Sequence, residues 1–254
     1  MRGDNELARE LADEAGRLLL DLRAAGGAGD ADSLRHQGDL SAHNLLVRRL
    51  AQERPGDAVL SEEGVDDLAR LLATRVWIVD PLDGTREYGE LDRADWAVHV
   101  ALWERGALVA GAVARPAMQS TVSTEHPPGI PGREPGPLRL AVSRSRPPSF
   151  VTALAAGLGA GLVPMGSAGV KACSVLDGVT DAYVHAGGQF EWDSAAPVAV
   201  ARSAGLHTSR IDGSPLVYNG PDARLPDLLI CRPELADDLL AALASVADYE
   251  KAVR

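Results

Sequence analysis

The stretch VWIVDPLDGTREYG, residues 76–89, places two carboxylates directly after an apolar run. Asp80 ends that run, Pro81 stiffens the turn, and Asp83 follows just before Gly84. An ordinary turn needs one Asp or Asn rather than two acids at the end of a buried strand. The pair therefore indicates a chemical role, because two close carboxylates repel each other unless a cation lies between them.

Two further acids stand at the ends of predicted elements, since Glu62 follows a short strand and Asp193 opens a helix. Taken singly, Asp193 is a good helix N-cap and Asp83-Gly84 is a common turn dipeptide. Four carboxylates gathered in one pocket would raise one another's pKa values unless cations sat among them. Hard oxygen ligands on short turns suit Mg²⁺. The set therefore predicts a Mg²⁺ site at which Gly84 lets the backbone approach a phosphate and Thr85 offers a hydroxyl.

The composition is that of a globular chain with 46% apolar and 24% charged residues over 254 positions, enough for one large domain or two closely packed ones. A net charge of −11 argues against a nucleic-acid polymer as partner. A small anionic ligand stays compatible, because cations at the site can reverse the local sign. No apolar run approaches the roughly 20 residues that span a bilayer, and the charged N-terminal stretch is unlike a signal peptide. We therefore expect no membrane partner and a cytoplasmic location.

The rarer residue types add two expectations. Cys173 and Cys231 stand outside any metal-binding pattern and are expected to be core thiols in a reducing compartment. The basic residues are nearly all arginines, and the lysines are Lys171 and Lys251 alone. A chain that otherwise uses Arg keeps a Lys where a compact ammonium is useful, so Lys171 is a candidate contact for an anion.

The elements that must position these residues mix helices and strands, with an antiparallel component. Apolar spacing predicts helices over residues 4–25 and 40–54, with residues 26–33 as a loop, so that Asp39 directly precedes the second helix. The other predicted elements are strands over 58–60 and 75–80, a hairpin of 96–103 with 107–114, a strand after Pro116, a strand over 138–143, helices over 148–157 and 168–177, a strand over 181–186, and helices over 192–204 and 233–246.

Residues 126–137, HPPGIPGREPGP, cannot form regular structure and are predicted to be a surface loop between two halves. Residues 1–125 would then form an N-terminal α+β half that carries most of the candidate metal ligands. Residues 138–254 would form a C-terminal α/β half that carries Asp193 and the substrate contacts. We expect the two halves to pack as one catalytic unit.

The segments LSEEG, WIVDPLDGTREY and EWDSAAP resemble, in this order, the signature of the inositol monophosphatase superfamily of Mg²⁺-dependent, lithium-sensitive phosphatases. The family has an acidic pair, then D-P-[IL]-D-G-T, then W-D-x-A-A, and the resemblance covers nearly the whole chain. It implies an α+β fold of the layered α-β-α-β-α sugar-phosphatase type, with the metal site where the two halves meet. It also implies Mg²⁺-dependent hydrolysis of a small phosphorylated substrate, and it leaves a homodimer open because relatives are often dimers.

The resemblance also implies the ligands of two Mg²⁺ ions. Glu62, Asp80 and the backbone carbonyl of Leu82 match the ligands of the first ion. Asp80, Asp83 and Asp193 match those of the second, so that Asp80 bridges the two. Glu62 could also hold a weaker third ion, and two of the ligands, Asp83 and Asp193, would touch the substrate as well.

The catalytic roles implied by the resemblance fall on Thr85, Asp39 and Glu62. The backbone N–H groups of Gly84 and Thr85 match the phosphate cradle. Thr85 matches the residue that orients and deprotonates the attacking water, and Asp39 matches the acid that pairs with it. The chain departs from the family pattern just before Asp39, where GDADSLRHQG lacks the usual threonine and lysine. This departure leaves open both the third ion and a non-catalytic alternative, a metal-dependent sensor of phosphorylated nucleotides.

Three segments favour the bisphosphate nucleotidase branch of the superfamily, which removes the 3′-phosphate of 3′-phosphoadenosine 5′-phosphate. They are DGTREY, AVSRSR and GSAGVKACSVLDG, and two more, DAYVHAGGQFEWDSAAP and DGSPLVYN, look like actinobacterial members of that branch. On this reading Ser143, Ser167 and Lys171 contact the nucleotide or its 5′-phosphate, with Lys171 as the cation.

The function expected from this resemblance is removal of the 3′-phosphate from 3′-phosphoadenosine 5′-phosphate, giving AMP, and from its sulfated form, in connection with sulfate assimilation. The alternatives within the same class are an inositol-1-phosphatase and a fructose-1,6-bisphosphatase. We interpret His99 and His185 as satisfied core or rim residues, although His185 stands where the branch often has a substrate-contacting Arg. Trp192 is interpreted as a packing residue.

Overall fold

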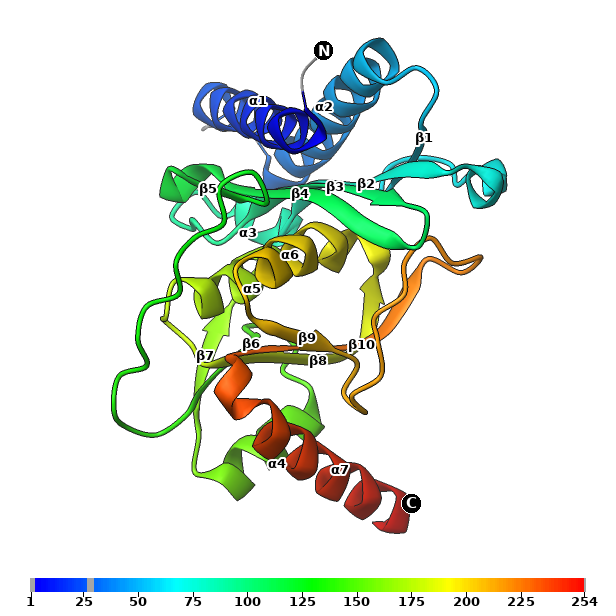
Figure 1. The fold of residues 1–254 in the computed structure, drawn as a ribbon. Helices are drawn as coiled ribbons and strands as arrows, with labels where there is room; N and C mark the ends of the chain where they lie inside the picture. Colours follow the sequence, from blue (N-terminus) through cyan, green and yellow to red (C-terminus); the bar gives the residue numbers. More distant parts are fainter. Residues whose placement is uncertain (1–2, 27–29, 254) are drawn as a thin grey trace.

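A computed structural model of the chain describes residues 3–26 and 30–253, with side chains described as far as residue 246. Two five-stranded sheets and three layers of helices alternate in the order α-β-α-β-α (Figure 1). The layered α+β fold predicted from the sequence is therefore confirmed.

The first sheet has the strand order β1-β2-β3-β4-β5, with β1 parallel to β2 and the other neighbours antiparallel. The predicted hairpin is confirmed as the pair β3–β4. The outer face of this sheet packs against α1 and α2 through leucines and alanines with little or no solvent exposure. The elements are α1 (Asp4–Ala25), α2 (Ala31–Glu53), β1 (Ala58–Ser61), η1 (Leu68–Leu72), β2 (Arg75–Asp83), α3 (Thr85–Gly89), β3 (Ala97–Glu104), β4 (Ala107–Arg115), η2 (Pro116–Met118) and β5 (Ser120–Ser123).

The second helix begins nine residues earlier than predicted, so Asp39 lies inside it rather than before it. Asp30 caps α2 by accepting a hydrogen bond from the backbone N–H of Ser33 at 3.1 Å. The predicted loop over residues 26–33 is wrong at 31–33, which are helical, and residues 27–29 of that loop lie outside the described residues. Gly38 is in fact a packing residue, since a Cβ at that position would press on the Tyr88 ring and on Leu82.

The second sheet has the order β7-β6-β8-β10-β9 and mixes parallel and antiparallel pairs. Three of its strands, β7, β9 and β10, were not predicted. Pro164 lies in β7 at the sheet edge and Pro226 lies at the bulge in β10, which are the places where a sheet tolerates proline. Helices α4 and α7 cover the outer face. The elements are β6 (Arg139–Ser143), α4 (Ser149–Leu158), β7 (Gly161–Met165), α5 (Ala168–Leu176), β8 (Ala182–Phe190), α6 (Glu191–Ser203), β9 (His207–Ser209), β10 (Arg224–Cys231), η3 (Pro233–Leu235) and α7 (Ala236–Val253).

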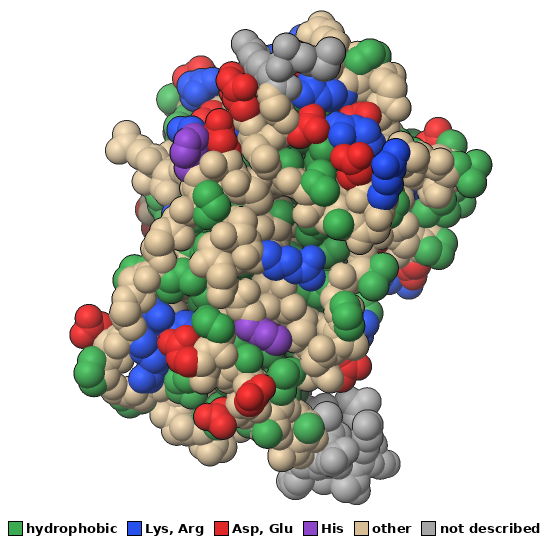
Figure 2. All heavy atoms as spheres, viewed as in Figure 1, with side chains coloured by type: hydrophobic (Ala, Val, Ile, Leu, Met, Phe, Trp, Pro, Cys, Tyr) green, Lys and Arg blue, Asp and Glu red, His purple; other side chains and the backbone are tan. Residues whose placement is uncertain are grey.

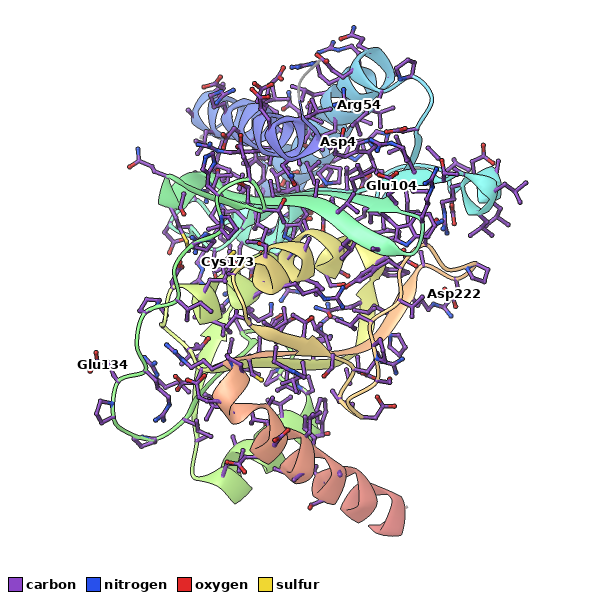
Figure 3. All side chains as sticks on the ribbon, viewed as in Figure 1. Asp4, Arg54, Glu104, Glu134, Cys173 and Asp222 are labelled. Atoms are coloured by element: carbon purple, nitrogen blue, oxygen red, sulfur yellow. The ribbon has the colours of Figure 1, made fainter. Side chains whose placement is uncertain are left out.

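The helices α5 and α6 form the middle layer and touch both sheets. Their buried side chains are mostly small, which lets the sheets approach the helices closely. At Gly111 of β4 the approach is so close that a Cβ would clash with Ala199 of α6. Cys173 lies in this layer (Figure 3), and both cysteines are free and buried, which confirms the prediction of core thiols.

The connection between the sheets is the long segment 126–137, which has no helix or strand, as predicted. Glu134 marks it at the edge of the molecule in Figure 3. The segment is tied to the second sheet by the Arg232 guanidinium, which donates to the carbonyl of Pro131 at 2.6 Å. Arg133 and Arg232 each lie 3.6 Å from the buried carboxylate of Asp181, so one acid anchors both the loop and the sheet.

Acidic and basic side chains are interspersed over the α1–α2 layer in Figure 2, without a continuous basic surface on this face. Arg75 illustrates the pattern, because it makes ion pairs with Asp4, Asp57 and Glu104. Among the described residues, none of the helices combines the length and apolar character needed to cross a membrane.

Candidate metal and phosphate site

Three of the predicted acids converge between the two sheets. Asp80 and Asp83 come from the end of β2, and Asp193 comes from the first turn of α6. Each offers one carboxylate oxygen, and these oxygens all lie within 4.8 Å of one another. Asp193 is oriented by the start of its helix, where it accepts a hydrogen bond from the backbone N–H of Phe190 at 2.6 Å. The structure thus brings together acids that are more than 100 residues apart in sequence.

The backbone at the end of β2 explains how two acids so close in sequence reach the same point. The strand bulges between Asp80 and Asp83, and Asp80 Oδ1 accepts a hydrogen bond from the N–H of Leu82 at 3.0 Å. Gly84 then adopts φ +88°, which L side chains rarely allow. A Cβ there would also crowd the carbonyl of Asp95. Strand β2 therefore extends through Asp83, three residues beyond its predicted end.

Thr85 and Asp39 meet beside these acids, as the family resemblance implied. Thr85 Oγ1 lies 3.0 Å from the carbonyl oxygen of Leu82 and 3.4 Å from Asp39 Oδ1. Asp39 reaches this point from the middle of α2. Burial raises the pKa of Asp39 to about 7, with a further increase from the nearby Glu63 and a smaller opposing effect from Thr85.

Glu62 lies next to the site, where its carboxyl group interacts with Asp80. It follows β1, and because β1 runs parallel to β2 their carboxyl ends lie at the same edge of the sheet. The residue as a whole is exposed, but its carboxyl group is enclosed enough that desolvation raises its pKa to about 7. A hydrogen bond with Asp80 lowers this pKa, whereas the charges of Asp83 and Asp39 raise it. Glu62 therefore borders the three-acid group rather than belonging to it.

The carboxylates of the group titrate differently. Burial, followed by repulsion from Glu62 and Asp83, raises the pKa of Asp80 well above its usual value. Burial and the charge of Asp83 raise the pKa of Asp193 to about 7. Burial also acts on Asp83, but contacts with His99, Lys171 and Ser167 outweigh it and hold the pKa of Asp83 below its usual value. Asp83 is thus kept ionised, whereas Asp80 and Asp193 have too little positive charge nearby to stabilise their ionised forms. A cation bound among the three carboxylates would supply that charge.

The start of α5 holds Asp83 in place. The Ser167 hydroxyl donates to Asp83 Oδ2, and the Gly169 N–H donates to the same oxygen at 2.7 Å. The Ser167 oxygen also accepts from the Val170 N–H at 3.0 Å and so caps the helix. Ser167, predicted to contact the substrate, therefore donates its proton to a metal-ligand candidate.

Lys171 is engaged by the protein in a similar way. Its side chain is only 6% exposed, and its Nζ donates to the carbonyls of Gly166 at 3.0 Å and Ser167 at 2.6 Å. The ammonium also lies 5.4 Å from the centre of the Tyr183 ring. Burial lowers the pKa of Lys171, while Asp83 and other acids raise it. Its charge reaches the site, but two of its three N–H groups are already used.

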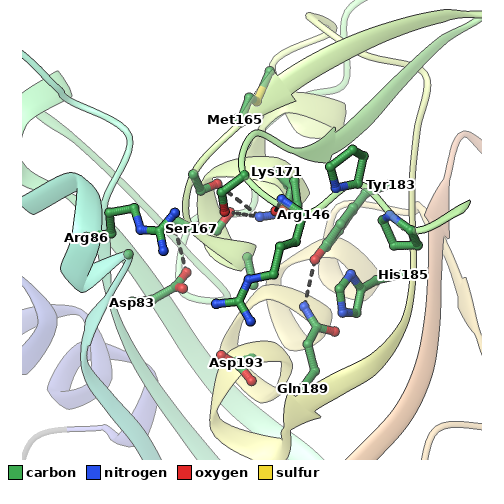
Figure 4. Close-up of a pocket in the computed structure, with 18 of the residues that line it drawn as sticks. Asp83, Arg86, Arg146, Met165, Ser167, Lys171, Tyr183, His185, Gln189 and Asp193 are labelled. Carbon is green, nitrogen blue, oxygen red and sulfur yellow. Dashed lines mark hydrogen bonds between the residues drawn. The ribbon is translucent and has the colours of Figure 1, made fainter. Parts of the chain in front are cut away.

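A pocket of about 620 Å³ opens from the acids toward the second sheet. Figure 4 shows Arg146 reaching into it toward Asp83 and Asp193, with Gln189 and His185 on the far wall. The residues that line it and matter below are Asp83, Gly84, Thr85, Arg86, Ser143, Arg146, Ser167, Lys171, Tyr183, His185, Gln189 and Asp193. All three predicted nucleotide contacts, Ser143, Ser167 and Lys171, are among them.

Sequence reasoning missed the two exposed arginines of this pocket, Arg86 and Arg146. Neither guanidinium has a hydrogen bond or ion pair recorded among the described residues, so both are available to an anion. Both arginines lie inside the segments DGTREY and AVSRSR, but the cation predicted from the sequence was the rarer Lys171.

His99 was also underestimated. It is fully buried, with Nε2 3.2 Å from Asp83 Oδ2 and Nδ1 3.1 Å from the carbonyl oxygen of Trp192. The Nε2 contact is not a well-aligned hydrogen bond, and it is an ion pair when the ring is protonated. Burial lowers the pKa of His99, but the charge of Asp83 outweighs this and raises it. A polar residue within the apolar stretch WAVHVALW was the signal that could have identified it.

The fold and site together define a class: a layered α-β-α-β-α protein with a cluster of carboxylates at the junction of its two sheets, beside a pocket that contains exposed arginines. The chain belongs to the inositol monophosphatase family, whose model matches residues 4–247. The resemblance seen in the sequence is thereby confirmed.

The chain is 53% identical over 239 residues to the "3′-phosphoadenosine 5′-phosphate phosphatase" of Mycobacterium tuberculosis, covering 91% of this chain and 90% of that protein. It is 30% identical over 191 residues to the "3′(2′),5′-bisphosphate nucleotidase CysQ" of Escherichia coli K12, covering 71% and 77% of the two chains. Among solved structures it is similar to CysQ from Bacteroides thetaiotaomicron, with a TM-score of 0.77, 26% identity, and coverage of 90% and 97%.

Proposed function

We propose that this protein is a Mg²⁺-dependent phosphomonoesterase that removes the 3′-phosphate of 3′-phosphoadenosine 5′-phosphate to give AMP, and acts likewise on the sulfated form. The observation that carries the proposal is the 53% identity, over 91% of the chain, to a mycobacterial protein named for that reaction. The acid cluster and the cationic pocket beside it support the same conclusion. A cytoplasmic role linked to sulfate assimilation, lithium inhibition and a homodimeric assembly complete the proposal by family resemblance.

The donor atoms of the site fit Mg²⁺, because they are carboxylate and carbonyl oxygens on short backbone turns. We assign Glu62, Asp80 and the Leu82 carbonyl to one ion, and Asp80, Asp83 and Asp193 to a second. A third, weaker ion at Glu62 stays part of the proposal. When bound, the ions would neutralise phosphate charge and make a nearby water more acidic.

The protein's own groups would position the attacking water. Thr85 Oγ1 lies between the Leu82 carbonyl and the Asp39 carboxylate, so its proton can be donated to either. In both orientations the oxygen of Thr85 is left as an acceptor for a water proton. When the hydroxyl points at Asp39, its proton would pass to the Asp39 carboxylate as the Thr85 oxygen takes the proton of the water. The backbone N–H groups of Gly84 and Thr85 would hold the phosphate at the same turn.

The rest of the pocket would bind the second phosphate of the substrate. Lys171 contributes its charge, but its N–H groups mostly serve the carbonyls of Gly166 and Ser167. We therefore assign the direct contact with the 5′-phosphate to Arg146, which extends into the pocket (Figure 4), with Arg86 near the 3′-phosphate. Ser143 and Ser167 line the same space.

A substrate panel tests this proposal. Phosphate release by the purified protein is measured on 3′-phosphoadenosine 5′-phosphate, inositol 1-phosphate and fructose 1,6-bisphosphate, with Mg²⁺ and with a chelator. We expect the nucleotide to give the highest kcat/KM and the chelator to abolish release. Inositol phosphate better by more than tenfold would overturn the substrate assignment. No Mg²⁺-dependent release from any substrate would favour the non-catalytic sensor instead.

A further inference from the structure

His99 lies in the middle of β3, on the strand next to β2, and its Cα is paired with that of Asp80. Its neighbours Val98 and Val100 are fully buried core residues, and so is His99 itself. The ring has no contact with solvent, so it cannot touch substrate directly. Any role it has must act through the groups around it.

Three elements meet at this ring. Nε2 faces Asp83 Oδ2 at 3.2 Å, and Nδ1 faces the carbonyl oxygen of Trp192 at 3.1 Å, immediately before Asp193. Nδ1 also lies 4.0 Å from Asp80 Oδ2. The third element is α5, where a Cβ on Gly169 would clash with the ring. Both nitrogens thus face oxygen atoms that accept protons, one from β2 and one from α6.

The contacts of the Asp83 carboxylate show how His99 and its neighbours hold this side chain in place. Its Oδ2 receives the Ser167 hydroxyl, the Gly169 N–H and the His99 Nε2 contact, all from the side of α5 and β3. No hydrogen bond to the other oxygen, Oδ1, is recorded among the described residues, and Asp83 offers one carboxylate oxygen to the three-acid group. An apolar side chain at position 99 would fill the same core space but would leave the Trp192 carbonyl without this donor.

We propose that His99 is a positioning residue, which fixes Asp83 and the first turn of α6 relative to each other and so sets the spacing of the ligands for the second Mg²⁺ ion. The inference rests on the proposed metal site. Groups that orient metal ligands in this way typically contribute about 10–100-fold to metal affinity.

The test compares three variants by calorimetric measurement of the Kd for Mg²⁺, starting from metal-free protein and without substrate. His99→Ala removes both contacts, and we expect Mg²⁺ binding weakened by about 10–100-fold. His99→Gln places an amide N–H close to the position of Nε2 and should recover most of this loss. His99→Asn places its amide near Nδ1, reaches Trp192 but not Asp83, and should recover less than His99→Gln.

A control separates positioning from general loss of packing. His207→Ala removes a histidine of β9 outside the pocket and should leave the Kd unchanged. Thermal unfolding in chelator shows which variants fold, and if His99→Ala does not, the Gln and Asn variants decide the question. Equal Mg²⁺ affinity of Gln and Asn, or an Ala variant within twofold of wild type, would overturn the inference and leave the proposed function intact. A wild-type protein that binds no Mg²⁺ would overturn both.

Discussion

The replacement Arg146→Ala should separate the substrates by the number of their phosphates. Arg146 is exposed, lines the pocket and reaches toward the acids without an ion pair recorded among the described residues. A hydrogen bond to a charged group contributes about 1.5–3 kcal/mol, and solvent around an exposed guanidinium favours the low end. A loss of about 1.4 kcal/mol corresponds to a roughly tenfold lower kcat/KM for 3′-phosphoadenosine 5′-phosphate. Inositol 1-phosphate has one phosphate, at the acids, and should be hydrolysed as by wild type.

The assay is phosphate release at saturating Mg²⁺ on both substrates, with Arg146→Lys as the variant that keeps the charge and Arg105→Ala, in the β3–β4 turn, as a remote control. The nucleotide effect should appear mainly in KM and should shrink at high salt, because the Debye length falls from about 10 Å at 0.1 M to about 3 Å at 1 M. Equal losses on the two substrates, or an unchanged nucleotide KM, would refute the assignment of Arg146.

In contrast to Arg146, Lys171 is bound by backbone carbonyls of the protein, and this changes the effect expected of its replacement. From the sequence alone, Lys171→Ala would spare inositol phosphate and weaken only the nucleotide. Its Nζ instead holds the carbonyls of Gly166 and Ser167, next to the Ser167 hydroxyl that binds Asp83. We expect Lys171→Ala to lower turnover on both substrates, whereas a loss confined to the nucleotide would show that Lys171 contacts the nucleotide directly.

Two further predictions concern stability. Since the pKa values of Asp39, Glu62 and Asp193 are raised to about 7, their protonated forms favour the folded state. In chelator this contribution is fully present below about pH 4, the pKa range of unfolded carboxyls, and is lost as the pH rises through 7. The melting temperature of the metal-free protein should therefore fall between pH 5 and 8. Addition of Mg²⁺ should raise the melting temperature most at pH 8. A melting temperature that rises between pH 5 and 8 and does not respond to Mg²⁺ would contradict this expectation. Asp181→Asn should destabilise the fold by about 3 kcal/mol in denaturant unfolding, because Arg232, 5% exposed, loses its buried counter-charge. The folded fraction should keep its kcat/KM, and an unaffected unfolding midpoint would show that the loop anchor is unimportant.

The acid cluster could be predicted because its information is local. The apolar run VWIV is followed directly by DPLDGT, whose proline and glycine specify the turn and whose two carboxylates are the candidate ligands. The hairpin of β3 and β4 was readable for the same reason, with the Glu104-Arg105-Gly106 turn between two valine-rich runs. Features decided by neighbours distant in sequence were harder to predict.

The predictions that were wrong or incomplete concern features that depend on residues distant in sequence. Residues 31–33 were predicted to be part of a loop, yet they belong to α2, in which Gly38 packs closely against the Tyr88 ring. The role of Lys171 depends on carbonyls that only the folded turn at 166–167 presents to it. The position of His99 beside Asp83 depends on the register between β3 and β2, which composition does not encode.

Carboxylates from both halves of the chain should jointly hold divalent ions beside the phosphate. A crystal grown with Mn²⁺ and inorganic phosphate, with data collected at the manganese edge, tests it most directly. We expect an anomalous peak coordinated by oxygens of Asp80, Asp83 and Asp193, with phosphate next to Gly84 at ligand distance from the metal. A phosphate-containing crystal with no metal among these three side chains would contradict it.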